Sequence, residues 1–407
     1  MKKKISVGTT VAIALIAAII TFQVTFVLTL GFAADKYSSK PKDGDFISEA
    51  MDRLEELDSV YRENYVGELD NDVLIDGILK GYVAGTGDLY GYYYNADELN
   101  DFLSDMRGEA VGIGVSVIFN TEYNCIEIIN VFPDSPALEA GLQAGDLIVA
   151  VGEDMKYISE VGYDAAVNMV RGEVGTEAVI HVARGTVATD LEEYRITRAK
   201  VTQVNVLSHV CELDSSVGVI KITSFDSATY DQFTSALKKL AKAGCDKFIF
   251  DLRYNPGGEL DSVVSILDYL LPKGPVIRIY DANDKLVDQR DSGKECVDFP
   301  MAVLVNGSTA SAAELFTSAL MDYDKATVVG ETTFGKGCMQ STQALADGAV
   351  KITYRMYKPP FSEGYHDVGI TPDVEVALDE ALANKNIYKI TDAEDSQLKA
   401  ALDALTK

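Results

Sequence analysis

Three residues stand out because together they could perform nucleophilic catalysis. Ser311 follows a run of small and polar residues and precedes two alanines, while Lys336 lies between two glycines. A serine hydroxyl is a weak nucleophile until a base removes its proton. A lysine amine can be that base when desolvation lowers its pKa from about 10.4 toward neutrality. Gln340 comes four residues after Lys336, so on a strand both side chains would lie on one face, where the amide could orient the amine.

The elements around Ser311 would place its hydroxyl at the start of a helix. Residues 301–305 are continuously apolar, as expected for a strand buried on both faces, and residues 312–321 have a helical pattern. A helix start leaves backbone N–H groups free, so the Ala312 N–H could donate to an oxyanion. Ser308 is the competing nucleophile, and helix capping is the simpler role for either serine.

A glycine turn after a second apolar strand could supply another donor. Residues 247–252 form this strand, and Gly257 and Gly258 follow it. Glycine permits close approach of the backbone, so either residue could complete an oxyanion hole with Ala312. We expect Asp251 and Arg253, which precede the turn, to anchor the strand and the turn through an ion pair or hydrogen bonds.

Other catalytic classes find little support. The chain has only three histidines, and a Ser–His–Asp arrangement that uses His366 stays an open alternative. The five cysteines are scattered, and no His-Glu-x-x-His motif is present, so we expect neither a metal nor another cofactor. The net charge of −27 should repel nucleic acid.

The order and spacing of the motifs at 251–258, 306–314 and 330–340 resemble the C-terminal processing peptidases, also called tail-specific proteases. The resemblance assigns the catalytic serine–lysine pair to Ser311 and Lys336 and the assisting role to Gln340. It implies an α/β fold with a layered crotonase-like or ClpP-like peptidase core over residues 199–378.

Residues 108–198 look like a PDZ domain inserted before that core. The sequence Gly112-Ile113-Gly114-Val115 has the form of a carboxylate-binding loop that leads into a strand, and residues 163–170 would form the helix beside the peptide groove. Exposed backbone amides can bind a terminal carboxylate, and an extended peptide can add to an open sheet edge. For the two glycines alone, a tight turn is the simpler explanation.

The N-terminus predicts export from the cytoplasm. Three lysines at 2–4 precede an uncharged run at 5–34, which is long enough to span a bilayer with the basic flank inside. A cleaved signal peptide is the alternative. We therefore predict a transmembrane anchor at 1–34, a linker and helical arm at 35–107, and a mostly helical, acidic tail at 379–407.

Together these features predict a membrane-anchored, extracytoplasmic bacterial serine endopeptidase. Its substrates would be proteins or peptides whose C-terminal tails bind the PDZ domain, and an acyl-enzyme would form on Ser311. The arm and tail make a homodimer plausible. The alternative function is an inactive PDZ adaptor or regulatory scaffold at the membrane.

Overall fold

The computed structural model of the chain describes residues 44–106, 109–185, 191–293, 297–379, 382, 385 and 387–406. The predicted anchor at 1–34 lies outside these residues. Among the helices that are described, none combines the length and the apolar composition needed to cross a bilayer. The chain divides into two compact units with the boundary after Gly77.

The first unit contains helical residues of the predicted arm. Helix α2 covers Gly44–Asn64, and helix α3, Asn71–Gly85, begins in this unit and crosses the boundary. Both helices lie within the helical arm predicted at 35–107. The guanidinium of Arg62, near the end of α2, donates to Asn71 Oδ1 over 2.8 Å, which joins the two helices at their turn.

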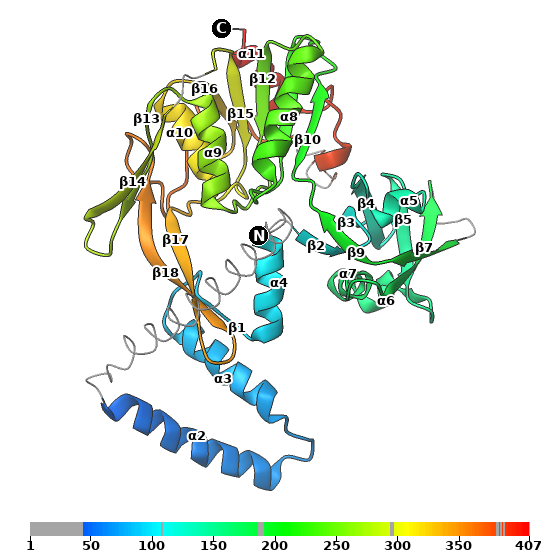
Figure 1. Cartoon of the computed structure of the whole chain (residues 1–407), viewed down its shortest axis with the longest axis vertical. Coiled ribbons are helices and arrows are strands. Elements are labelled where there is room, and N and C mark those ends of the chain that lie inside the picture. The colour runs from blue at the N-terminus through cyan, green and yellow to red at the C-terminus, as the bar shows by residue number, and fades with distance from the viewer. Residues whose placement is uncertain are drawn as a thin grey trace, which may run out of the picture. The chain divides into compact units, whose positions relative to one another are not determined.

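A six-stranded sheet organises the second half of the chain (Figure 1). Its strands follow the order β10-β11-β12-β15-β16-β19, and every neighbouring pair is parallel except β10 with β11. The strand bounds are β10 Val206–Val210, β11 Val217–Ile222, β12 Lys247–Asp251, β15 Met301–Val305, β16 Ala326–Gly330 and β19 Val374–Glu375. The helices of this layer are α8 Thr229–Lys242, α9 Leu260–Leu270, α10 Ala312–Asp322 and α11 Ser396–Ala404.

Alternation along the strands explains the layers. Successive side chains of a strand point to opposite faces, so Phe250 packs in the core that also contains residues of α8, α9 and α10, whereas its neighbour Ile249 belongs to the cluster that contains Leu398 of α11. Strand β15 is buried at every position, as its continuous apolar run predicted. The layered α/β core is confirmed.

A second sheet carries the strand that follows Lys336. Strands β1, β18, β13 and β14 are neighbours in that order, and β17 pairs with β18. The bounds are β1 Tyr92–Tyr94, β13 Gly274–Tyr280, β14 Leu286–Ser292, β17 Cys338–Ala344 and β18 Ala349–Lys358. Residues 92–94 form an edge strand on β18.

The PDZ region forms a six-stranded antiparallel sheet, in the order β3-β4-β5-β7-β8 with β6 paired to β5, and a separate pair, β2 with β9. Its strands are β2 Glu109–Gly112, β3 Val115–Asn120, β4 Cys125–Val131, β5 Asp146–Val151, β6 Lys156–Tyr157, β7 Glu177–Arg184, β8 Glu192–Thr197 and β9 Ala199–Thr202. Its helices are α5 Pro136–Glu139, α6 Ile158–Val161 and α7 Tyr163–Val170, and α4 Ala96–Met106 precedes them.

The C-terminal residues belong to the core. Helix α11 buries Leu398 and Ala401 against the central sheet. The guanidinium of Arg253 joins this helix to the glycine turn, because it donates to Asp251 (2.9 Å) and to Asp395 (2.8 Å). The ion pair predicted between Asp251 and Arg253 is therefore present and is buried.

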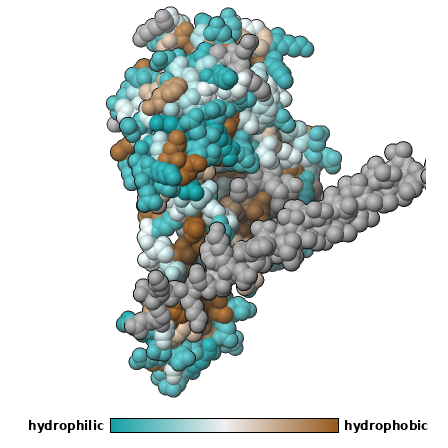
Figure 2. All heavy atoms as spheres, turned by 60° about the vertical axis from the view of Figure 1, so that its left-hand side comes forward, coloured by the Kyte–Doolittle hydropathy of each residue, from teal (hydrophilic) through white to brown (hydrophobic). Residues whose placement is uncertain are grey.

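One face of the molecule is mostly hydrophilic. On the face drawn in Figure 2, hydrophilic residues predominate and apolar residues form small separate patches. Scattered apolar side chains are usual on soluble surfaces.

Candidate active site

Three neighbouring parallel strands end at the candidate site. The glycine turn follows β12, Ser311 follows β15, and Lys336 follows β16. Because parallel strands place their carboxyl ends at the same edge of a sheet, the loops after them converge there. The edge therefore brings together residues that lie far apart in the sequence.

Ser311 lies at the sharp turn between β15 and α10. Its backbone has φ 55° and ψ −118°, a conformation that L-residues rarely adopt. Gly257 packs against this turn, since a Cβ on it would lie 2.7 Å from Ser311 Cβ and 2.9 Å from the Ala312 nitrogen. Only glycine fits at position 257. Its close approach lets the glycine turn pack directly against the backbone at Ser311.

Hydrogen bonds fix the two loops to each other. The Thr309 hydroxyl donates to the Leu252 carbonyl over 2.9 Å, and the Ala310 N–H donates to the Asn255 carbonyl over 2.9 Å. The Asn255 side chain in turn accepts the Gly257 N–H over 2.8 Å. Of the three predicted oxyanion donors, Gly257 therefore already has a partner, whereas Gly258 and Ala312 line the pocket beside Ser311.

The carboxylate of Glu314 connects the nucleophile to the loop of the base. Glu314 is completely buried. One of its oxygens accepts the N–H groups of Ser311 and Lys336, each over 2.8 Å. The other accepts the Thr333 hydroxyl over 2.6 Å and the Gly335 N–H over 2.7 Å. This carboxylate therefore holds the backbones of Ser311 and Lys336 in a fixed relation.

The amine of Lys336 is half-buried and its pKa is lowered. Burial is the main cause, and the positive charge of Lys351 acts in the same direction, whereas Cys338, Glu314 and Asp88 oppose it. A lysine base must be neutral, so the lowered pKa suits that role. In the described residues Lys336 and Ser311 share no hydrogen bond, and Lys336 Nζ lies 4.6 Å from the centre of the Tyr90 ring.

Gln340 does not lie as the spacing argument assumed. Lys336 precedes β17, and a β-bulge between Met339 and Gln340 shifts the alternation of side chains. The amide of Gln340 donates to Cys338 Sγ and to the Thr353 hydroxyl, each over 3.3 Å. The argument that two residues four apart share a strand face therefore fails here. The assisting role of Gln340 stays a prediction.

A pocket of about 850 Å³ brings the predicted residues together. Ser311, Lys336 and Gln340 all line it. The competing Ser308 is exposed in the preceding turn and is not among the lining residues. His366 accepts the Gly337 N–H at its Nδ1 over 3.2 Å and is not in the lining either.

Two tyrosines near the site were missed from the sequence. The Tyr357 hydroxyl donates to the Lys336 carbonyl over 2.9 Å, and the Tyr365 hydroxyl donates to the Ser311 carbonyl over 3.5 Å. Burial raises the pKa of both phenols, which keeps them neutral donors. No local sequence pattern distinguishes these two tyrosines. Glu314, in contrast, lies three residues after Ser311, the N-cap of α10, and this spacing is that of a capping box.

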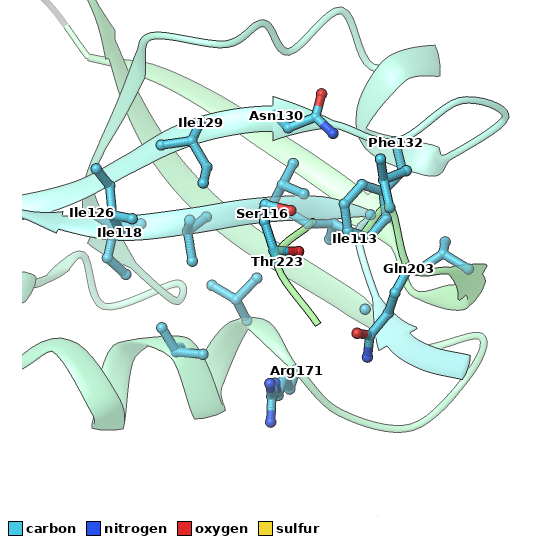
Figure 3. Close-up of a pocket in the computed structure, with 18 of the residues that line it drawn as sticks. Ile113, Ser116, Ile118, Ile126, Ile129, Asn130, Phe132, Arg171, Gln203 and Thr223 are labelled. Carbon is cyan, nitrogen blue, oxygen red and sulfur yellow. The ribbon is translucent and has the colours of Figure 1, made fainter. Parts of the chain in front are cut away.

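A second pocket lies in the PDZ region (Figure 3). It has a volume of about 390 Å³, and all four residues of the predicted loop line it, from Gly112 to Val115. Tyr163, Val167 and Val170 of helix α7 form another wall. The structure thus places the loop and the groove helix around one cavity, as a peptide groove requires.

Comparison with known families agrees with the assignment of a peptidase core and of a PDZ domain. The model of peptidase family S41 matches residues 216–376, and the PDZ domain model matches residues 103–183. The fold and the candidate site thus define a PDZ-containing peptidase of the serine class.

Curated relatives identify the family more closely. The chain is 36% identical over 303 residues to the carboxyl-terminal-processing protease of Synechocystis, covering 74% of this chain and 69% of that protein. It is 33% identical over 333 residues to a probable CtpA-like serine protease of Staphylococcus epidermidis, covering 80% of this chain and 65% of the relative's length. The chain belongs to the carboxyl-terminal-processing peptidase family.

Solved structures show the same fold. A putative S41 protease from Bacteroides fragilis is 20% identical, with a TM-score of 0.54, and the match covers 86% of this chain and 96% of that one. At this identity the likeness concerns the fold alone.

Proposed function

We propose that the protein is a serine endopeptidase in which Ser311 is the nucleophile and Lys336 the general base. One observation carries the proposal. Loops after adjacent strands bring a serine on a strained turn and a lysine with a lowered pKa to one pocket. Family membership supports the same assignment.

In the first half of the reaction, the neutral amine of Lys336 takes the proton of the Ser311 hydroxyl as Oγ attacks the peptide carbonyl. The long side chain must turn toward Ser311, because the two groups share no hydrogen bond in this structure. The N–H groups of Ala312 and Gly258 would stabilise the oxyanion, and one such donor is often worth about 10²–10³ in rate.

In the second half, the Lys336 ammonium returns its proton to the leaving amine as the C–N bond breaks. An acyl-enzyme then remains on Ser311. The amine, neutral again, activates a water molecule, which attacks the ester, releases the new carboxylate and restores the hydroxyl. Gln340, which lies on β17 and contacts Cys338, would help to orient the Lys336 amine.

The PDZ groove would select substrates by their C-terminal tails. Its loop supplies backbone amides for a terminal carboxylate, and its apolar walls suit the side chains of an extended peptide. The pocket of Ser311 would then cleave elsewhere in the captured protein.

The catalytic part would work outside the cytoplasm. The uncharged run at 5–34 behind three lysines supports a single membrane anchor with that orientation. Protease treatment of intact spheroplasts checks this. A chain that stays fully protected, although it is degraded after lysis, would contradict the proposed orientation.

The mechanism is tested with the full chain in mild detergent on a mixed pool of unfolded proteins. New termini are identified by mass spectrometry. We expect the wild type to generate them, and the Ser311→Ala and Lys336→Ala variants to generate none. Persistent cleavage by purified Ser311→Ala would refute the assignment. A wild type that binds tails without cleaving any protein would favour an adaptor.

A further inference from the structure

An aromatic ring from before the PDZ domain covers the candidate base. The Tyr90 ring centre lies 4.6 Å from Lys336 Nζ. Tyr90 precedes both regions that match known families, so neither model includes it. The ring is half-buried, and burial raises the pKa of its phenol, which therefore stays neutral.

The segment that carries this ring is fixed to the peptidase sheet. The Asp88 carboxylate accepts the Thr353 N–H over 2.7 Å and the Thr353 hydroxyl over 2.8 Å. It also accepts the Tyr90 N–H over 3.0 Å. Two residues later, β1 pairs with β18, which contains Thr353. Thr353 also accepts the Gln340 amide, so the anchor and the candidate assisting residue share one hydroxyl.

The titratable groups that act on the pKa of the amine come from four segments of the chain. Glu314 lies on α10, Asp88 before β1, Cys338 on β17 and Lys351 on β18. The two carboxylates would favour the ammonium, but each already accepts several hydrogen bonds, which reduces their attraction for the amine. A neutral ring adds cover without adding a negative charge.

We propose that Tyr90 is a positioning residue for the base: its ring holds the Lys336 amine and excludes water from it, so that the segment before the PDZ domain completes the active site. The ring covers the neutral amine that must accept the serine proton. This inference rests on the proposed serine–lysine mechanism.

The test compares Tyr90→Ala with Tyr90→Phe in the full chain, with fluorescein-labelled casein as the substrate. We expect Tyr90→Ala to lower kcat roughly 10- to 100-fold, as misplacement of a catalytic group does, with little change in KM. Water would return to the amine, and its pKa would rise because burial is the main cause that lowers it. The acidic limb of the kcat profile should therefore move to higher pH. Tyr90→Phe keeps the ring and should stay within about twofold of the wild type.

Leu89→Ala is the matched control, because Leu89 is adjacent but 86% exposed, and we expect it to behave as wild type. Folding of each variant is checked by its melting temperature. Three results would overturn the inference: a Tyr90→Ala enzyme with unchanged kcat and acidic limb, a gain in activity, or a Phe variant as impaired as the Ala variant. Ser311→Ala and Lys336→Ala are measured in parallel. If they stay active, the mechanism itself fails, whereas their inactivity beside a normal Tyr90→Ala rejects only the role of Tyr90.

Discussion

At the scale of single residues, the candidate site depends on a buried carboxylate as much as on the serine and the lysine. Glu314 accepts four hydrogen bonds from groups on the nucleophile turn and on the loop of the base. A buried carboxylate is stable only when such donors satisfy it. We infer that Glu314 couples the geometry of Ser311 to that of Lys336 without touching the substrate.

Glu314→Gln should therefore disrupt the site. Each carboxylate oxygen of Glu314 accepts two donors. Whichever way the glutamine amide is turned, its NH₂ group would therefore face donors that it cannot accept. At least one buried N–H then loses its partner, which costs about 1–3 kcal/mol. We expect urea unfolding to show this loss of stability and kcat to fall by more than tenfold. Glu331→Gln, at an exposed position nearby, is the control. Unchanged stability and kcat in Glu314→Gln would show that the four bonds do not couple the loops.

At the scale of elements, the sequence predicted those helices and strands that local patterns of apolar residues specify. The strand at 301–305 has the predicted bounds, because a continuous apolar run of this length is typical of a strand buried on both faces. The helix after Ser311 begins at Ala312 as expected. These elements also position the predicted catalytic residues, whose roles the family resemblance assigned.

Features that depend on distant pairing could not be predicted in this way. Strand β1 forms because Tyr92–Tyr94 pairs with residues 349–351 of β18. The three tyrosines alone do not indicate which strand they pair with. The bulge before Gln340 is likewise a property of the β17–β18 pair. The position of Tyr90 over Lys336 follows from the same pairing, so it was missed for the same reason.

The C-terminal helix illustrates how one element supports another. Asp395 precedes α11 and accepts the N–H groups of Gln397 and Leu398, each over 3.0 Å. It also pairs with the buried guanidinium of Arg253, next to the glycine turn. The tail was predicted as a possible assembly element, and in this structure it is also part of the peptidase core.

Asp395→Ala should consequently destabilise the core. Removing one partner of a buried ion pair typically costs about 3–5 kcal/mol, and loss of a helix cap about 1 kcal/mol more. Denaturant unfolding measures the change. Asp403→Ala changes an exposed aspartate of the same helix and should shift stability by less than about 0.5 kcal/mol. If the two variants unfolded alike, the pair with Arg253 would contribute little.

At the scale of the whole molecule, the proposed function divides the work between two pockets. Substrate capture belongs to the PDZ groove and bond cleavage to the pocket of Ser311. A change in the groove should then affect only substrates that carry a suitable tail, whereas a change at Ser311 should affect every substrate. A pair of peptides with the same cleavable sequence, one with a free C-terminal tail and one without the tail, separates these effects.

Val167→Glu applies this logic, because Val167 lines the groove from helix α7. A tail bound there would bury the new carboxylate beside its own terminal carboxylate, which we expect to cost more than the roughly 1.4 kcal/mol that corresponds to a tenfold change. We expect kcat/KM for the tailed peptide to fall at least about tenfold and that for the tailless peptide to stay as in the wild type. Ala165→Glu places the same charge on an exposed position of α7 and should leave both values unchanged. Equal losses for the two peptides would mean that the groove acts on the catalytic pocket itself instead of selecting tails.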